Sequence, residues 1–332
     1  MKKVYIKIII CYNKFEMMRM QKDLKIIFMG TPKFAVPILE ELIKDYHVVL
    51  VVCQPDREKD KKGNLLYPPV KELALQNNIP VFQPLKVYTD YQEILNYQPD
   101  LIVTCAYGQI IPNEILNCPK YGCINVHGSL LPKLRGGAPI HWAIINGNKE
   151  TGITIMDMTS KMDAGDIISS RSIPIADDDY LDLVYEKLSY LGRDLLKETL
   201  PSILNQTATR TKQDESKVTF GMNIKKGEER INFNNSATNI RNLIRGLNSH
   251  PGAYCLLDGK RLKIYTASIL DQKSSLPPGT ITGLTKDGIL VSTQDNILKI
   301  QEIKLEGKKR CLVSDFLNGN QHKESLIGKV LE

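Results

Sequence analysis

The residues best suited to chemistry are Asn125 and His127, which stand two positions apart in an apolar stretch that begins at Cys123. Side chains at positions i and i+2 of a strand point to the same face. An amide that donates hydrogen bonds and an imidazole that titrates near neutral pH would therefore meet at one strand end. Open α/β sheets usually bind their ligands at that end of the strands. The pair predicts an active site there.

The elements that must position this pair alternate between strands and helices up to residue 206. Continuous apolar runs are typical of buried parallel strands, and helical periodicity separates them. The alternation predicts a Rossmann-like, doubly wound, mostly parallel sheet. Predicted strands are Leu24–Met29, Val48–Cys53, Asp100–Ala106, Cys123–Val126, Gly152–Met158 and Ile167–Ile175, and predicted helices are Val70–Asn77, Tyr88–Tyr97, Pro139–Asn146 and Leu181–Leu204.

The texture of the chain changes after Asn205. Residues 207–217 are polar and are predicted to form a linker. Residues 218–332 contain short apolar runs separated by turns such as Asp258-Gly259, a pattern typical of a small β-barrel of the oligonucleotide-binding type. Residues 1–23 precede the first regular strand and are interpreted as a dispensable N-terminal extension. We therefore expect a catalytic domain at 24–206 and a barrel domain at 218–332.

Charge is concentrated in the C-terminal part of the chain. Residues 211–332 carry 19 Lys and Arg against 13 Asp and Glu, a net charge of +6 out of +7 for the whole chain. A basic domain favours a polyanionic partner such as nucleic acid, while a merely solvated basic surface is the alternative.

The seven cysteines are scattered without a C-x-x-C pair, and no apolar run reaches the length of a membrane span. The sequence thus predicts a cytoplasmic protein without disulfides, without a structural metal and without a membrane anchor.

Longer motifs around the pair resemble those of the folate-dependent formyltransferases. They are INVHGSLLPKLRGGAPIHWAI at 124–144, MDMTSKMDAGDII at 156–168, IIFMGTPKFAVPIL at 26–39 and RGLNSHPGAY at 245–254. From Lys25 onward the chain is similar to the branch of this family that acts on methionyl-tRNA. The resemblance implies transfer of a formyl group from 10-formyltetrahydrofolate, the co-substrate, to the α-amino group of methionine on initiator Met-tRNA, in the service of translation initiation.

The resemblance also assigns roles to residues of the predicted catalytic domain. Asn125, His127 and Asp163 match the family's catalytic trio, and the turn Ser129, Leu130, Leu131, Pro132 matches the one associated with the folate. In formyl transfer, Asn125 would donate a hydrogen bond to the oxyanion of the tetrahedral intermediate. His127 would move a proton, and Asp163 would orient it through the ring nitrogen that faces away from the substrate. No metal is implied.

Basic residues in both domains are expected to contact tRNA. In the lysine-rich loop the family pattern usually has an arginine where this chain has Lys61, which keeps the charge but loses the bidentate guanidinium. The family also usually has a tryptophan where this chain has His250. The candidates for tRNA contact are Arg57, Lys61, Lys62, Lys225, Lys226, Arg241 and Arg245, together with Lys260, Arg261 and Lys263.

Two alternatives remain open at the level of sequence. The first is another enzyme of formyl-folate chemistry, such as a sugar-nucleotide formyltransferase, and the second is a non-catalytic RNA-binding protein. The basic β-rich domain favours tRNA over a sugar, and retention of all three trio residues favours an enzyme. We expect the protein to act as a monomer.

Overall fold

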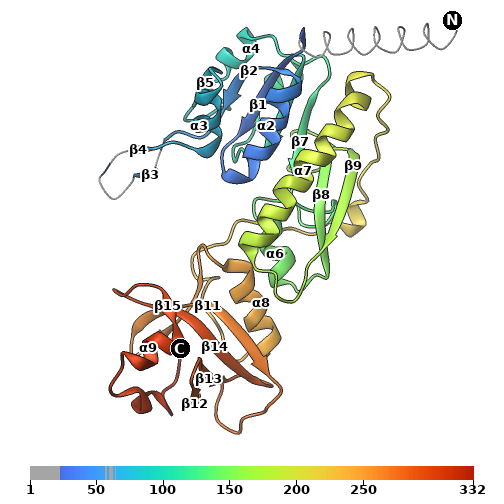
Figure 1. Cartoon of the computed structure of the whole chain (residues 1–332). Helices are drawn as coiled ribbons and strands as arrows, with labels where there is room; N and C mark the ends of the chain where they lie inside the picture. The colour runs from blue at the N-terminus through green and yellow to red at the C-terminus, as the bar shows by residue number, and fades with distance from the viewer. Residues whose placement is uncertain (1–22, 57, 60–62, 64) are drawn as a thin grey trace, which may run out of the picture. The chain divides into compact units, whose positions relative to one another are not determined.

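The computed structural model describes residues 23–56, 58–59, 63 and 65–332, which form two compact units (Figure 1). Each unit is made of three separate segments of the chain, whereas the sequence predicts one catalytic domain, a linker and one barrel domain in succession. Those predicted domain boundaries stay a prediction. Unit 1 comprises the described residues up to Gly137, Gly152–Ser172 and Glu186–Phe220, and unit 2 comprises Ala138–Thr151, Ile173–Tyr185 and Gly221–Glu332.

Unit 1 is built on a seven-stranded sheet with the order β5-β2-β1-β6-β7-β8-β9. Strands β5, β2, β1, β6 and β7 pair in parallel, and β8 pairs antiparallel to β7. This arrangement confirms the predicted Rossmann-like sheet. The bounds are β1 Lys25–Gly30, β2 His47–Val52, β5 Val81–Phe82, β6 Leu101–Cys105, β7 Cys123–His127, β8 Glu150–Asp157 and β9 Ile167–Pro174.

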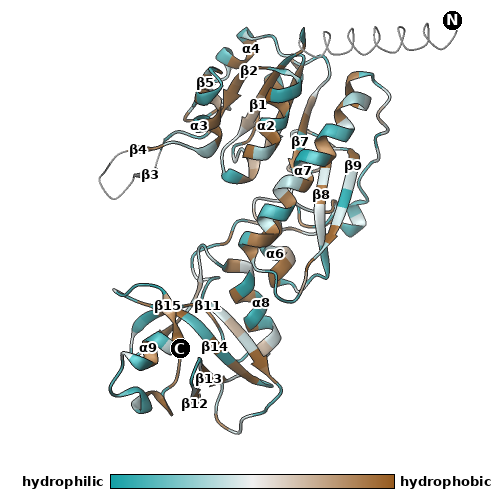
Figure 2. Cartoon of the chain, in the orientation of Figure 1, coloured by the Kyte–Doolittle hydropathy of each residue, from teal (hydrophilic) through white to brown (hydrophobic). Residues whose placement is uncertain are grey.

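The central strands are hydrophobic along their length because helices cover them on both faces (Figure 2). One face packs against Ile94 of α4 and Ile115 of α5. On the other face, Gly192 of α7 brings the helix backbone close to Val126 of β7. The helices of unit 1 are α2 Val36–Asp45, α3 Pro69–Gln76, α4 Gln92–Asn96 and α5 Asn113–Leu116, together with α7 Leu181–Leu204, whose first residues belong to unit 2. Unit 1 also has 3-10 turns at Lys33–Ala35 and Glu215–Lys217 and an antiparallel pair of short strands, β3 Glu58–Lys59 and β4 Leu65–Leu66.

One predicted helix is shorter than expected. The sequence predicts a helix over Tyr88–Tyr97, but α4 begins only at Gln92. The preceding residues form a turn, in which the backbone N–H groups of Thr89 and Asp90 both donate to the Lys86 backbone oxygen. The helix therefore begins only after this turn, and apolar periodicity does not define such a boundary closely.

Unit 2 contains an antiparallel sheet with the order β10-β11-β14-β13-β12, and β15 pairs with β14. The residues that follow Leu326 bridge the two ends of this order: Gly328 and Lys329 bond to Ile281 of β12, and Glu332 bonds to Leu256 of β10. The barrel-like fold predicted for this region is thus completed by the tail. The bounds are β10 Ala253–Leu257, β11 Lys260–Leu270, β12 Ile281–Thr285, β13 Gly288–Ser292, β14 Ile297–Leu305 and β15 Cys311–Leu312.

Two helices pack closely inside unit 2. A Cβ added to Gly246 of α8 would lie 2.6 Å from the Ile145 side chain and 3.1 Å from the backbone oxygen of His141, so only glycine permits this approach of α8 to α6. Ser236 caps the N-terminus of α8 by accepting from the backbone N–H of Asn239. The helices are α6 Pro139–Ile145, α8 Ala237–Leu247 and α9 Val313–Asn318, with a 3-10 turn at Lys323–Leu326.

Candidate active site

Asn125 lies on β7 between two neighbouring strands, paired with Thr104 of β6 and Met156 of β8. The Thr104 hydroxyl, which is 2 % exposed, lies 2.9 Å from Asn125 Oδ1 and donates to it. This contact turns the amide so that its Nδ2 donors point away from Thr104. Sequence reasoning missed Thr104, and the only signal for it is a hydroxyl inside an otherwise apolar strand.

His127 is 5 % exposed, and each of its ring nitrogens has a neighbour. Nε2 lies 3.1 Å from the backbone oxygen of Leu134, which can only accept, so Nε2 carries a proton. Nδ1 lies 3.7 Å from Asp163 Oδ1. Since Leu134 occupies Nε2, Nδ1 is the ring nitrogen available for proton transfer, and it is the one that faces Asp163. This arrangement differs from the expected one, in which Asp163 would face the ring nitrogen turned away from the substrate.

Asp163 lies in the turn between β8 and β9 and has a backbone φ of 50°. Its Oδ2 accepts a hydrogen bond of 2.8 Å from the backbone N–H of Gly136. A Cβ on Gly165 would lie 1.8 Å from the backbone oxygen of Asp157, so the turn closes only with glycine at that position. The MDAGD motif thus has a local reason for its glycine, and it brings Asp163 Oδ1 to 3.7 Å from His127 Nδ1, while the catalytic role of both residues stays a prediction.

The turn Ser129–Pro132 follows β7 and is held by Thr154 of β8. The Thr154 hydroxyl donates to the backbone oxygen of Ser129 and accepts from the backbone N–H of Leu131. Ser129 and Leu131 are buried, and Leu130 packs against Gly152. The turn is rigidly built beside the site, and its contact with folate stays a prediction.

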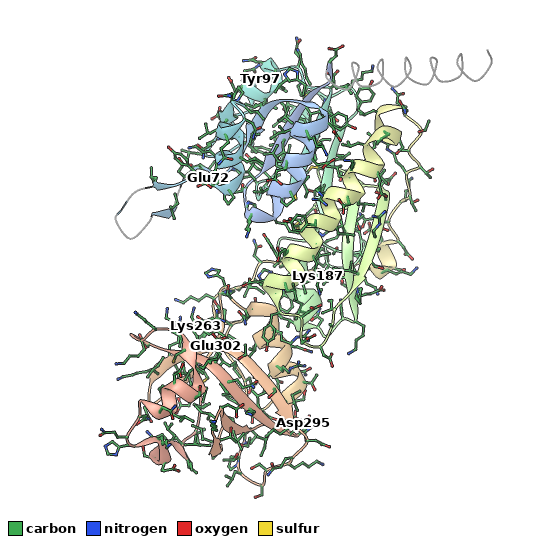
Figure 3. All side chains as sticks on the ribbon, viewed as in Figure 1. Glu72, Tyr97, Lys187, Lys263, Asp295 and Glu302 are labelled. Atoms are coloured by element: carbon green, nitrogen blue, oxygen red, sulfur yellow. The ribbon has the colours of Figure 1, made fainter. Side chains whose placement is uncertain are left out.

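The basic residues of unit 2 differ in how accessible they are. Lys225, Lys226, Lys260 and Arg261 are exposed, and the guanidinium of Arg261 stacks 4.1 Å from the ring centre of Tyr254. Lys263 of β11, labelled in Figure 3, donates to the backbone oxygen of Pro251 and lies opposite Lys304 of β14.

The two arginines of α8 bond to backbone oxygens of their own unit. Arg241 donates to Asp177. Arg245 is 4 % exposed and donates to Asp179, Ala176 and the side chain of Asn242. Because Arg245 is buried and already hydrogen-bonded, this geometry does not support its predicted contact with a tRNA phosphate, and that contact stays a prediction. Arg57, Lys61 and Lys62 lie outside the described residues.

His141 of α6 is largely buried, and burial with the proximity of His250 lowers its pKa to about 4, against the opposing effect of Asp182. It is therefore neutral at physiological pH. Burial likewise raises the pKa of the Cys53 thiol to about 12. Among the residues described, no cluster of three or more His, Cys, Asp or Glu side chains is suited to a metal ion, and no helix is long and apolar enough to cross a membrane.

Two family models match most of the chain. The family model described as formyl transferase matches residues 24–200, and the one described as formyl transferase, C-terminal domain, matches residues 223–321. The chain belongs to the formyltransferase family.

Individual relatives match over nearly their whole length. Methionyl-tRNA formyltransferase of Malacoplasma penetrans is 46 % identical over 94 % of this chain and 98 % of its own. The protein of the same name from Staphylococcus epidermidis is 50 % identical over 92 % of this chain and 99 % of its own.

The fold also matches solved structures. A sugar 3N-formyl transferase, WlaRD, has a TM-score of 0.63 at 21 % identity, covering 86 % of this chain and 99 % of that one. HypX of Aquifex aeolicus, solved in complex with tetrahydrofolic acid, has a TM-score of 0.58 at 19 % identity over 89 % of this chain and 47 % of its own. At this level of identity, the likeness establishes the shared fold.

Proposed function

We propose that the protein transfers the formyl group of 10-formyltetrahydrofolate to the α-amino group of methionine on initiator Met-tRNA. The observation that carries the proposal is that Asn125, His127 and Asp163 lie together at the end of β7, in a chain that aligns over 92–94 % of its length with methionyl-tRNA formyltransferases. Each of the three side chains has the chemical group that one step of this reaction requires.

The attacking α-amine has an ordinary pKa of about 7.7, so a useful fraction is neutral near pH 7. Its addition to the formyl carbon produces a tetrahedral oxyanion. Asn125 Nδ2, turned outward by Thr104, donates to that oxyanion. His127 Nδ1 takes the proton from the attacking nitrogen and returns it to the departing folate nitrogen, while Nε2 stays bonded to Leu134.

Asp163 supports the charged intermediate of this proton transfer. When Nδ1 is protonated, the imidazolium lies against the Asp163 carboxylate, and their opposite charges stabilise each other in a largely water-excluded site. Gly136 holds the other carboxylate oxygen and keeps Asp163 from rotating away. The carboxylate acts as a fixed counter-charge at the nitrogen that carries the transferred proton, whereas the acid of serine-protease triads bonds the other ring nitrogen.

The two substrates would use different parts of the molecule. The folate would rest on the turn Ser129–Pro132, next to the trio. The exposed basic residues of unit 2 would bind the tRNA backbone, together with the lysine-rich loop, in a cytoplasmic, monomeric enzyme. They are Lys225, Lys226, Lys260 and Arg261.

A formyl-transfer assay with charged initiator tRNA tests the proposal directly. Formyl-methionyl-tRNA should form, whereas free methionine and an amino-sugar nucleotide should remain unmodified. His127→Ala should lower kcat by about 10²–10⁴-fold. Formylation of the sugar nucleotide instead of the tRNA, or full activity of His127→Ala, would overturn the assignment.

The tRNA assignment has a separate test in salt. Affinity for Met-tRNA should fall steeply, by about tenfold or more, between 50 and 200 mM salt, because phosphate contacts release counterions. Affinity that stays constant over this range would argue against contact through the basic residues of unit 2.

A further inference from the structure

The polar segment 211–219, of which residues 211–217 are predicted to be part of a linker, is hydrogen-bonded to the active-site loops within unit 1. At one end, Thr211 exchanges two backbone hydrogen bonds with Ile167, of 2.8 and 2.9 Å. At the other end, the Thr219 backbone oxygen accepts from the Arg135 N–H, and its hydroxyl accepts from the Leu134 N–H, both at 2.9 Å. The segment therefore runs from the strand that follows the Asp163 turn to the loop that follows His127.

Gln213 lies midway and joins these two loops through a single amide. Its Nε2 donates to the backbone oxygens of Asp163 and Gly165, each at 2.8 Å. Its Oε1 accepts from Nε and Nη2 of Arg135, at 3.0 and 2.8 Å. Both protons and both lone pairs of the amide are used, so the side chain has one satisfied orientation.

Arg135 is held just as firmly, although no step of the reaction uses it. Its side chain is 5 % exposed, and its guanidinium also bonds both carboxylate oxygens of Glu215. Those hydrogen bonds lower the pKa of the exposed Glu215 carboxyl. The neighbours of Arg135 in the chain are Leu134, whose oxygen holds His127 Nε2, and Gly136, whose N–H holds Asp163 Oδ2.

We infer that Gln213 is a positioning residue for the trio: by tying the Asp163 turn to the Arg135 loop, it sets the gap between Asp163 and His127. This inference rests on the proposed function. The backbone of Asp163 has a positive φ, which a non-glycine residue keeps only where its surroundings hold it. The gap is 3.7 Å, so a small shift of the turn would weaken the charge contact, and a displacement of about 1 Å can cost about 10²-fold in rate.

The variant that tests this role is Gln213→Glu. It keeps the size of the side chain and an acceptor for Arg135, but it replaces the Nε2 donor by an oxygen that faces two backbone oxygens. We expect kcat for formyl transfer to fall about 10–100-fold, with KM for both substrates within about twofold. The matched control is Gln76→Glu, the same chemical change at the exposed end of α3, for which kcat should stay within about twofold.

A double-mutant cycle separates positioning from a general loss of structure. If Gln213 acts through the Asp163 carboxylate, then Gln213→Glu should change kcat by less than about twofold in an Asp163→Asn background. Losses that multiply in the double variant would indicate a merely structural role and overturn the inference. Should Gln213→Glu fail to fold by circular dichroism, Gln213→Met, which keeps the length and removes both polar contacts, takes its place in the same cycle.

The outcomes also distinguish this inference from the proposed function. If the wild-type protein does not formylate Met-tRNA, the proposed function fails. If it does, and His127→Ala is inactive while the Gln213 variants keep full kcat, only the role of Gln213 is overturned.

Discussion

Asn125 of β7 and Arg245 of α8 are both polar residues set among apolar ones, and the sequence suggests a function for each, yet their hydrogen bonds differ. Asn125 Oδ1 accepts from Thr104, while its Nδ2 has no hydrogen-bond partner among the described residues. Arg245 spends Nε, Nη1 and Nη2 on acceptors of its own unit. A positioned polar residue with unused hydrogen-bond donors can therefore bind a substrate, whereas a residue whose donors are all bonded within its own unit stabilises the fold.

The substitution Asn125→Ala tests whether the Nδ2 donor of Asn125 acts in catalysis. Removing one oxyanion donor should lower kcat by about 10²–10³-fold, because no other donor replaces it, while the free energy of unfolding changes by less than about 1 kcal/mol. Steady-state kinetics and urea denaturation measure the two quantities. A large loss of stability without loss of kcat would place Asn125 in the same class as Arg245.

Arg245→Met should show the opposite pattern. Loss of three buried donors should lower the free energy of unfolding by about 2–4 kcal/mol, since their acceptors lose strong hydrogen bonds. Lys225→Met, at an exposed position, should change it by less than about 0.5 kcal/mol. If Arg245→Met unfolds like the wild type but binds Met-tRNA tenfold more weakly, the arginine contacts tRNA after all.

The substitution Thr104→Val tests whether the Thr104 hydroxyl orients the Asn125 amide. The substitution keeps the shape of the side chain but releases the amide, so we expect kcat to fall about tenfold with little change in KM. Thr104→Ser, which retains the hydroxyl, should recover most of the activity. Equal activity of the two variants would show that β7 orients the amide without help from β6.

His141 predicts a pH dependence of stability rather than of catalysis. Its folded-state pKa of about 4 lies below its ordinary value of 6.5, so between these values the unfolded chain binds more protons. The contribution of His141 is fully present above pH 6.5 and is lost as the pH falls toward 4, at up to about 1.4 kcal/mol per pH unit. Urea midpoints at pH 7 and 5 should therefore differ less in His141→Gln than in the wild type, and an equal difference would refute the assignment.

The smallest effect should come from Tyr107→Phe. The Tyr107 hydroxyl is buried without a hydrogen-bond partner in the described part of the chain. Its removal should change the free energy of unfolding by less than about 0.5 kcal/mol, whereas Tyr107→Ala should cost about 3 kcal/mol through the lost ring. Destabilisation of Tyr107→Phe by more than 1 kcal/mol would reveal a hidden partner, such as a bound water.

The sequence predicts the strand that carries Asn125 and His127 better than it predicts the residues that surround them. Strand periodicity places Asn125 and His127 on one face because it depends only on neighbours in the chain. Asp163 needs the family resemblance, since the turn that brings it to His127 depends on a close backbone approach at Gly165. Thr104 cannot be identified from the sequence, because a threonine whose hydroxyl bonds a neighbouring strand looks the same there as any threonine within an apolar strand.

Residues that make long-range hydrogen bonds are the ones that sequence reasoning misjudges. Gln213 lies in a segment whose composition is typical of a linker, although its amide is fully used. The sequence predicts that Arg245 contacts tRNA because of its charge, although backbone oxygens distant in the chain accept its hydrogen bonds. Composition reports which groups are available, and only the folded chain determines which of them meet.

The tail that joins β12 to β10 has a consequence for handling the protein. If the residues from Gly328 onward were removed, the N–H and C=O groups of Ile281 and Leu256 that they pair would be exposed on two strand edges. Unpaired edges are templates for strand addition by another copy of the chain, and hence for aggregation. Pairing by the last five residues thus keeps these two strand edges from pairing with another copy of the chain. A C-terminal tag should therefore be attached through a flexible spacer and not directly to Glu332.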